Sequence, residues 1–197
     1  MASVRSVLNV AFSPPILLMV AKVYIPVLFP ATFLIALASV KLDGVLAGAT
    51  GLTLFEAFLP GAPVNYAIAA VTFVIGLVSW LLTYEQLVNK GEGSPSPTAG
   101  RTRKLVVNGI YAYCRNPSVW GKLIGVLAVG FALNSFSFCF ILIPVLLAIS
   151  LVEKVWRQEP QLVEVFGDDY LQYQEQVPLF VPWGLIFPSR KFQGFKD

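Results

Sequence analysis

The amino-acid sequence gathers its apolar residues into runs that are long enough to cross a lipid bilayer. Apolar residues make up 56% of the 197 residues and charged residues only 13%, an apolar share above that of ordinary soluble domains. A spanning helix needs about 20 mostly apolar residues, so a chain of this length has room for about four or five spans. The sequence therefore predicts an all-α fold, a polytopic transmembrane helical bundle that forms a single domain over residues 1–197.

Four apolar runs are predicted to span the membrane. They cover residues 14–40, 64–87, 118–133 and 136–156. Lys22 and two prolines interrupt the first run, and a proline inside a helix removes a backbone hydrogen bond, so we expect this span to be kinked. The stretch 41–63 is broken by charges, glycines and prolines, and it predicts either a poor fifth helix or a re-entrant segment. Asn134 and Ser135 predict a tight turn between the last two spans.

Positively charged residues are distributed unevenly between the two sides of this topology. With four spans, Arg5, the segment 90–115 and the segment 154–196 all fall on one side, and Lys41 falls on the other. Because cytoplasmic loops carry an excess of Lys and Arg, we expect both termini and the polar loop to be cytoplasmic. The expected membrane is the endoplasmic reticulum in a eukaryote and the inner or plasma membrane in a prokaryote.

The sequence contains no histidine and only two cysteines, and this composition excludes several kinds of site. Histidine-ligated metal centres, Ser-His-Asp triads and Cys-His dyads cannot be built from these residues. Cys114 and Cys139 have neither the number nor the spacing of a zinc site, so we expect two free thiols and no bound metal. The formal charge of +3 comes without a basic stripe interleaved with aromatic residues, so no nucleic-acid partner is expected.

The one long hydrophilic stretch lies between the second and third predicted spans. Residues 91–104 are rich in glycine, serine and proline, and they end in Arg101, Arg103 and Lys104. Such a segment suits a mobile lid over a water-facing opening, with its basic residues toward anionic headgroups. The alternative is a flexible connector.

The segment after the last span predicts a C-terminal amphipathic interfacial helix, because its apolar residues recur near helical spacing among polar ones. Gly167 is expected to break this helix, and the side chain of Asp168 is expected to cap its restart. Tyr170 and Tyr173 are interpreted as anchors in the headgroup zone, where aromatic rings collect.

Residues 105–121 carry the first pattern that is specific to a family. They read Leu-Val-Val-Asn-Gly-Ile-Tyr-Ala-Tyr-Cys-Arg-Asn-Pro-Ser-Val-Trp-Gly, and Gln-Glu-Pro-x-Leu, Phe-Gly-x-x-Tyr-x-x-Tyr and Val-Pro follow between residues 158 and 178. This series resembles the isoprenylcysteine carboxyl methyltransferase and phospholipid N-methyltransferase superfamily. Its members carry Leu-Val-x-x-Gly-x-Tyr, Arg-His/Asn-Pro-x-Tyr-x-Gly and Glu-Glu-x-x-Leu in this order. The resemblance covers roughly residues 91–182.

The resemblance implies a membrane-embedded enzyme that uses S-adenosyl-L-methionine. It places this cofactor between the Arg-Asn-Pro segment and the Glu motif, with Arg115 and Glu159 as the catalytic pair. The implied cofactor-binding residues are Leu105, Val106, Gly109, Tyr111, Arg115, Asn116, Pro117, Gly121, Gln158 and Glu159.

The chemistry of S-adenosylmethionine agrees with these residue types. The cofactor presents a carboxylate, an ammonium group, a ribose diol and an adenine, so its site needs a fixed cation, an acceptor and an apolar slot. Arg115 can supply the cation and Glu159 the acceptor. Leu105 and Val106 can form the apolar wall. Because the sulfonium already makes the methyl group electrophilic, the protein has mainly to position the reactants and exclude water.

Three positions depart from the family pattern. Val119 stands where the family often has Tyr, Gln158 where it has the first Glu, and Arg103 where it commonly has His. If these groups orient substrate or cofactor, the acceptor differs from prenylcysteine or the activity is reduced. Arg115 also has an alternative interpretation as a snorkelling anchor, and Glu159 has one as a solvated charge.

The sequence leaves four functions open. The first is methyl transfer from S-adenosylmethionine to a lipophilic acceptor that enters from the bilayer, with a prenylcysteine carboxylate as the leading candidate. The second is methylation of a phospholipid or another lipophilic amine or small molecule. The third is a membrane reductase of the sterol or steroid type that uses NADPH, and the fourth is a non-catalytic membrane scaffold. Membrane lipid is the expected surrounding partner in all four.

Overall fold

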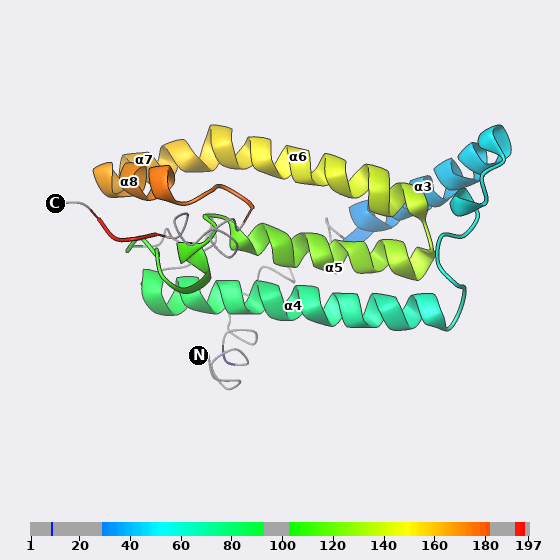
Figure 1. The fold of residues 1–197 in the computed structure, drawn as a ribbon, viewed down its shortest axis with the longest axis horizontal. Coiled ribbons are helices and arrows are strands. Elements are labelled where there is room, and N and C mark those ends of the chain that lie inside the picture. Colours follow the sequence, from blue (N-terminus) through cyan, green and yellow to red (C-terminus); the bar gives the residue numbers. More distant parts are fainter. Residues whose placement is uncertain (1–8, 10–28, 93–102, 182–191, 196–197) are drawn as a thin grey trace. The chain divides into compact units, whose positions relative to one another are not determined.

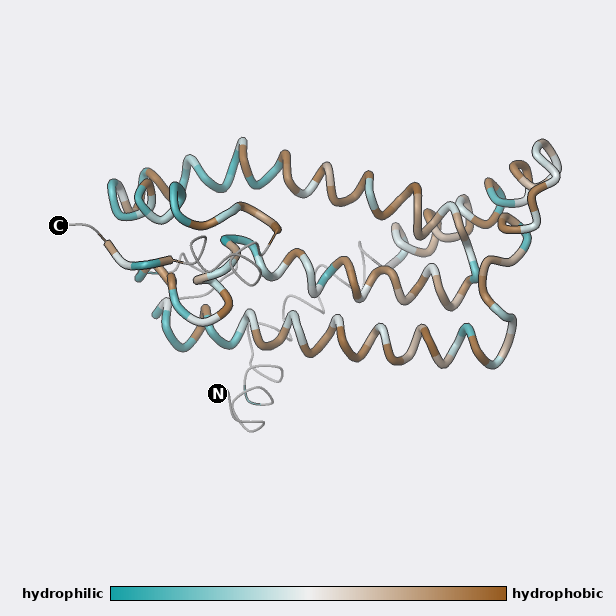
Figure 2. Tube along the Cα trace, in the orientation of Figure 1, coloured by the Kyte–Doolittle hydropathy of each residue, from teal (hydrophilic) through white to brown (hydrophobic). Residues whose placement is uncertain are grey.

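The computed structural model describes residues 9, 29–92, 103–181 and 192–195, and every regular element in these ranges is a helix (Figure 1). The expected all-α fold is confirmed. The larger helices are α3 (Phe29–Thr50), α4 (Val64–Gly91), α5 (Pro117–Leu133), α6 (Ile143–Glu153), α7 (Glu159–Phe166) and α8 (Asp168–Gln176). Hydrophobic residues follow most of the length of α4, α5 and α6, whereas hydrophilic residues gather on α7 and α8 (Figure 2).

Three of the described helices are long and apolar enough to cross a membrane. They are Pro30–Thr50, Val64–Gly91 and Phe138–Phe166. Large apolar side chains on them are exposed, for example Val45 at 67% and Val71 at 61%, as expected where lipid covers a helix. The third predicted span is the apolar helix α5, which at 17 residues is shorter than the roughly 20 residues of a typical span.

The predicted boundary between the first span and the stretch 41–63 is wrong. Helix α3 continues without a break past Val40 to Thr50. Asp43 does not end the helix because it is buried, 5% exposed, and its carboxylate is hydrogen-bonded. The residues that follow form a short 3-10 turn, η2 (Thr53–Phe55), before α4 begins. The part of the predicted first span before Phe29, including Lys22, lies outside the described residues.

The helix that begins at Phe138 runs to Phe166 and contains two π-helical turns. The turns are η4 (Phe138–Leu142) and η5 (Lys154–Gln158), which flank α6. In each, the backbone N–H after the turn donates to the carbonyl five residues earlier. Such turns add one residue to a helix and occur often at functional sites. The segment after the predicted last span therefore continues that span as α7, and a separate helix begins only at α8.

Gly167 separates α7 from α8 with a left-handed φ of +56°, which confirms the predicted break. The predicted capping role of Asp168 is wrong. Gly167 itself occupies the N-cap position of α8, and no side-chain hydrogen bond caps it. Asp168 and Asp169 lie in the first helical turn, where their negative charges interact favourably with the helix dipole.

The chain divides into two compact units, and α4, α5 and the long last helix each contribute residues to both. One unit comprises residues 11–79 and 121–147. In this unit α4 and α5 approach each other at Gly76, where a Cβ would lie 2.4 Å from the backbone nitrogen of Gly125. The carbonyl oxygen of Gly121 would lie 2.9 Å from the same Cβ. Glycine is therefore required at residue 76, because small residues allow membrane helices to pack closely.

The same unit holds a buried acid, Asp43 of α3. Its Oδ2 accepts a hydrogen bond from the hydroxyl of Ser135, and its Oδ1 accepts one from the backbone N–H of Ser137 at 2.8 Å. The hydroxyl of Ser135 also accepts the N–H of Phe138 at 3.2 Å. The first N–H groups of a helix have no partner within it, so Asp43 and Ser135 together satisfy the start of the last helix.

The predicted lid is described only at its edges. The backbone N–H groups of Arg103 and Lys104 both donate to the carbonyl of Gly91, at 2.8 and 3.0 Å, which brings the chain back to the end of α4. Residues 93–102 lie outside the described residues. The lid therefore stays a prediction.

Candidate active site

The second compact unit comprises residues 1–10, 80–120 and 148–197. In this unit the Arg-Asn-Pro segment is attached to the chain that follows α8. The N–H of Arg115 donates to the carbonyl of Pro178 at 3.0 Å, and the N–H of Asn116 donates to the carbonyl of Leu179 at 3.2 Å. Pro117 is the first residue of α5, where the missing N–H costs no helical hydrogen bond. The backbone that carries the Arg115 side chain is therefore held by these two hydrogen bonds and by the start of α5.

The turn before Arg115 depends on Gly109. The 3-10 helix η3 (Gly109–Ala112) begins with a φ of +67°, and a left-handed conformation of this kind costs other residues about 1–2 kcal/mol. A Cβ at Gly109 would also lie 2.2 Å from Oε1 of Gln86. That oxygen accepts the backbone N–H of Ile110 at 3.3 Å. Gln86 of α4 therefore holds the turn, and a side chain at residue 109 would have to displace the amide that does so.

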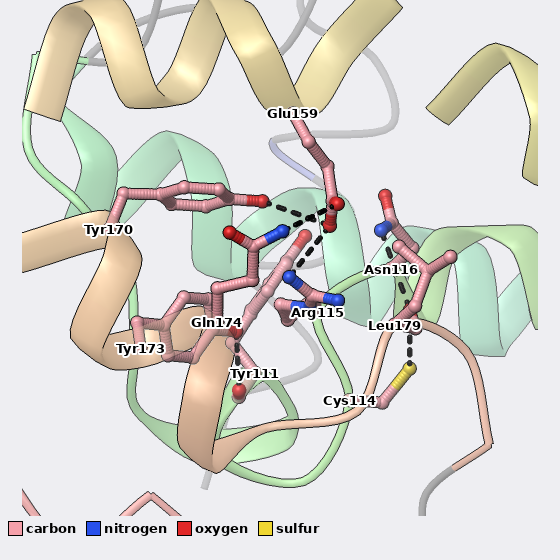
Figure 3. Close-up of polar contacts among 9 residues, drawn as sticks. All are labelled: Tyr111, Cys114, Arg115, Asn116, Glu159, Tyr170, Tyr173, Gln174 and Leu179. Carbon is pink, nitrogen blue, oxygen red and sulfur yellow. Dashed lines mark hydrogen bonds and ion pairs between the residues drawn. The ribbon is translucent and has the colours of Figure 1, made fainter. Parts of the chain in front are cut away.

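Glu159 is the first residue of α7 and follows the π-turn η5 directly. Its side chain is 8% exposed and that of Arg115 is 9% exposed, and Nη1 of Arg115 lies 2.8 Å from Oε1 of Glu159 (Figure 3). The alternatives of a snorkelling Arg115 and a solvated Glu159 are wrong, because the two groups are buried against each other. Removing two ions from water costs several kcal/mol, so such a pair needs further hydrogen bonds.

Helix α8 supplies further hydrogen bonds to Glu159. The hydroxyl of Tyr170 donates to Oε1 at 3.3 Å, and Nε2 of Gln174 donates to Oε2 at 2.9 Å (Figure 3). The two side chains are four residues apart and therefore lie on one face of the helix. Each carboxylate oxygen has a donor, so α8 fixes the orientation of Glu159 in addition to the ion pair.

Arg115 is less completely satisfied than Glu159. Its Nε and Nη1 are buried and make no directed hydrogen bond within the described part of the chain, although Nη1 lies at ion-pair distance from Glu159. A guanidinium offers five N–H donors in a planar fork that matches a carboxylate. Buried donors without a partner are rare in folded proteins. The arrangement can therefore accept an anionic group at Arg115 while α8 continues to hold Glu159.

A buried apolar cluster lies around the tyrosines of α8. Its members are Val107, Tyr170, Tyr173 and Val177. Leu105 packs against this cluster, and Val106 is buried at 7% exposure. The hydroxyl of Tyr173 donates to the carbonyl of Tyr111 at 2.7 Å and so connects α8 to η3 (Figure 3). The interpretation of Tyr170 and Tyr173 as headgroup anchors is wrong, because each is only 2% exposed and bonded within the protein.

Burial changes the acid–base behaviour of the groups near the ion pair. It raises the pKa of Tyr170 well above its ordinary value, and the charge of Glu159 adds to this shift. Loss of solvent also raises the pKa of Tyr111 and that of Tyr173. The same cause raises the pKa of the Cys114 thiol to about 11. All four groups therefore stay protonated at neutral pH, and they serve as hydrogen-bond donors or packing groups rather than as bases or nucleophiles.

The structure brings all the predicted cofactor-binding residues except Gly121 into one unit. Gly121 belongs to the other unit, where its carbonyl faces Gly76. Gln158 lies in the unit of the ion pair, but its amide is hydrogen-bonded to Lys154 and Glu153. Binding of a cofactor by any of the predicted residues stays a prediction.

Three contributors to the site were not among the predicted residues. They are Tyr170, Gln174 and Gln86. Tyr170 belongs to the Phe-Gly-x-x-Tyr-x-x-Tyr piece, so the motif contained the signal for it. Gln174 lies one helical turn after Tyr170, so helical periodicity provided a signal as well. Nothing in the sequence marks Gln86, because its contact with Ile110 joins α4 to a turn on the far side of the polar loop.

The fold and the site together define an integral membrane protein that holds a buried Arg–Glu pair among its helices. Residues 64–169 match the family model of phospholipid methyltransferases, and the chain belongs to this family. Over 99 residues the chain is 33% identical to the protein-S-isoprenylcysteine O-methyltransferase of Schizosaccharomyces pombe. The alignment covers 49% of this chain and 42% of the S. pombe protein, so the chain matches less than half of that relative. No solved structure is significantly similar to the chain.

Proposed function

We propose that this protein binds S-adenosylmethionine and transfers its methyl group to a lipophilic acceptor that enters from the bilayer. The observation that carries the proposal is the buried pair of Arg115 and Glu159. Glu159 is hydrogen-bonded at both carboxylate oxygens, whereas Arg115 keeps a buried Nε donor that has no partner within the described part of the chain. The family of the chain and the name of its S. pombe relative support methyl transfer as the reaction.

The residues present fit the polar groups of S-adenosylmethionine. The buried Nε of Arg115, which has no partner within the described part of the chain, suits the carboxylate, and Glu159 suits a positively charged group because Tyr170 and Gln174 already hold it in place. When bound, the cofactor supplies an electrophilic methyl group on a sulfonium. The protein has to orient the reactants and exclude water, and the low exposure of the ion pair is suited to both tasks.

The protonation states of the site favour a carboxylate acceptor. A carboxylate attacks without losing a proton, whereas an alcohol or an ammonium group first needs a base. The raised pKa values of Tyr170, Tyr173 and Cys114 make these groups poor bases at neutral pH. We therefore propose a prenylated cysteine carboxylate as the acceptor, in line with the name of the S. pombe relative. A phospholipid amine is the second candidate, because the family model is that of phospholipid methyltransferases.

Calorimetric titration of the detergent-purified protein with S-adenosylmethionine and with NADPH tests the proposal. We expect S-adenosylmethionine to bind and NADPH not to bind. Binding of NADPH alone would support a membrane reductase, and binding of neither would support a non-catalytic scaffold.

The acceptor is tested with S-adenosylmethionine labelled in its methyl group. We expect label to enter a farnesylated cysteine with a free carboxylate, and not its methyl ester, which is the matched control. Label in phosphatidylethanolamine vesicles and none in farnesylcysteine would show that the amine is the acceptor.

We propose further that the termini and the polar loop face the cytoplasm, on the strength of the distribution of Lys and Arg in the sequence. A Ser96→Cys reporter in a variant that lacks the two native cysteines should be labelled by a membrane-impermeant reagent from the cytoplasmic side. Labelling from the opposite side only would reverse the proposed orientation.

A further inference from the structure

The π-turn η5, directly before Glu159, has a set of side-chain hydrogen bonds of its own. Nζ of Lys154 donates to Oε1 of Gln158 at 2.6 Å. Nε2 of Gln158 donates to both carboxylate oxygens of Glu153, at 3.1 and 3.2 Å. Lys154 also lies 3.6 Å from the carboxylate of Glu153. We call Glu153, Lys154 and Gln158 the clamp.

The hydrogen bonds of the clamp require the geometry of the π-turn η5 and could not form in a straight α-helix. Glu153 and Gln158 are five residues apart, and at about 100° per residue they would point about 140° apart in an α-helix. In η5 the backbone N–H of Glu159 donates to the carbonyl of Lys154, five residues earlier, so residues at this spacing lie near each other. The bonds between Gln158 and Glu153 can therefore form in the π-turn and are lost when the helix straightens.

The register of this turn decides which side chain faces Arg115. A π-turn contains one residue more than an α-turn, so straightening it would rotate Glu159 away by about 100°. Gln158 would then take the angular position of Glu159 and present a neutral amide to a buried guanidinium. Glu159 therefore faces Arg115 only while η5 is a π-turn.

Exposure divides the turn into two faces. Val155, Trp156 and Arg157 are exposed, with Trp156 at 79%. The three clamp residues are partly buried, and Glu159 is buried. Within the clamp the side chain of Lys154 is 12% exposed and that of Glu153 is 41% exposed, so the clamp lies between the exposed face and the buried side chain of Glu159.

We propose that Gln158 is a positioning residue and not a cofactor ligand: together with Glu153 it selects the π-turn that aims Glu159 at Arg115. The effect of Gln158 on cofactor binding rests on the proposed function. The effect of Gln158 on the ion pair of Arg115 and Glu159 does not, so the two effects are tested separately.

The first test needs no cofactor. Thermal unfolding in detergent is measured for Gln158→Ala, for Glu159→Gln and for the double variant. Because Gln158 acts through Glu159, we expect Gln158→Ala to lower the Tm in the native background and to have at most half of this effect when Glu159 is already Gln. Arg157→Ala, on the exposed face of the same turn, is the matched control and should have the same small effect in both backgrounds. Additive effects of Gln158→Ala and Glu159→Gln would overturn the inference.

The second test measures the Kd for S-adenosylmethionine by calorimetry. We expect Gln158→Ala and Glu153→Ala to weaken binding about 10-fold to 100-fold, because a misplacement of about 1 Å can cost 100-fold. Arg157→Ala should stay within about twofold of the native protein. If Gln158→Ala binds as tightly as the native protein, Gln158 does not position Glu159.

A deletion provides the rescue that a direct ligand would not allow. Removing Trp156 from the Gln158→Ala variant takes out the extra residue of the π-turn, so the helix becomes straight with Glu159 still directed at Arg115. We expect this deletion to restore the affinity to within about threefold of the native value. A folded deletion variant that stays weak would show that Gln158 contacts the cofactor itself. If the native protein does not bind S-adenosylmethionine, the proposed function fails, and the unfolding cycle still decides the inference.

Discussion

Asp43 and Glu159 are both buried carboxylates, 5% and 6% exposed, but the two units satisfy them in different ways. Asp43 accepts hydrogen bonds from neutral donors, the hydroxyl of Ser135 and the N–H of Ser137. Glu159 accepts hydrogen bonds from neutral donors on α8 and also faces the guanidinium of Arg115. The fold therefore satisfies Asp43 with neutral donors alone, whereas Glu159 faces an arginine whose buried Nε has no partner within the described part of the chain.

This comparison shows that burial of an acid does not by itself identify a functional site. The informative feature is the group opposite the acid. The hydroxyl of Ser137 also makes no hydrogen bond within the described part of the chain, but it is neutral and its unpaired state costs little compared with that of a guanidinium. Asp43 therefore has the character of a structural cap, and Glu159 that of a group in a binding site.

Of the substitutions considered, Arg115→Ala should have the largest effect, and this effect should be on cofactor binding. We expect the binding free energy of S-adenosylmethionine to weaken by about 2–5 kcal/mol, or roughly 30-fold to several thousand-fold in affinity. The reason is that the buried carboxylate of the cofactor would lose the guanidinium that we propose as its partner. Calorimetry measures this, with Arg157→Ala as the control on an exposed arginine. Unchanged affinity and turnover in Arg115→Ala would mean that the ion pair is structural, like Asp43.

Asp43→Ala should affect stability and not binding. We expect the free energy of unfolding to fall by about 1–3 kcal/mol, because the Ser135 hydroxyl and the N–H of Ser137 lose their acceptor. Chemical unfolding in detergent measures the loss. Asp43→Asn keeps one acceptor oxygen and should cost less. A folded Asp43→Ala protein with weakened cofactor binding would contradict the distinction between the two acids.

Tyr170→Phe should have a smaller effect on binding than Arg115→Ala. It removes one hydrogen bond to Glu159, which we expect to cost about 0.5–1.5 kcal/mol, or roughly twofold to 13-fold in affinity. Tyr173→Phe is the matched control, because the hydroxyl of Tyr173 donates to the carbonyl of Tyr111 and not to Glu159. Equal losses of affinity in the two variants would show that the tyrosines act on the packing of α8 rather than on Glu159.

Ionisation of the Cys114 thiol should have the smallest effect on stability at neutral pH. Its thiol pKa rises from 9.0 to about 11 on folding, so the folded state holds the proton more tightly than the unfolded state. Its contribution to stability is therefore complete below pH 9 and is lost as the pH rises from 9 to about 11. In a Cys139→Ser variant, iodoacetamide at pH 8 should label the native protein far more slowly than the unfolded protein. Rapid labelling would indicate that water reaches the neighbourhood of Arg115.

The helices were predicted well where the apolar run ends at residues that prefer water. Helix α4 begins at the predicted Val64 and ends at Gly91, four residues beyond the predicted end at Leu87, where the glycine-rich stretch begins. Helix α5 begins at Pro117, one residue before the predicted Ser118. The end of α3 was predicted wrongly because hydropathy counts Asp43 as a break. Only the packing of α3 against Ser135 and Ser137 supplies the hydrogen bonds that allow an acid inside this helix.

The sequence by itself determined that the chain is all-α and apolar enough for a membrane, and that Arg115 and Glu159 flank a helical hairpin within a recognisable family pattern. These conclusions depend on composition and on order along the chain. The tertiary structure decided how the ion pair is built: the π-turn that aims Glu159, the donors from α8 and the buried Nε of Arg115, which has no partner among the described residues. A single extra residue in a helix turns a side chain by about 100°, so these features depend on packing that no local pattern specifies.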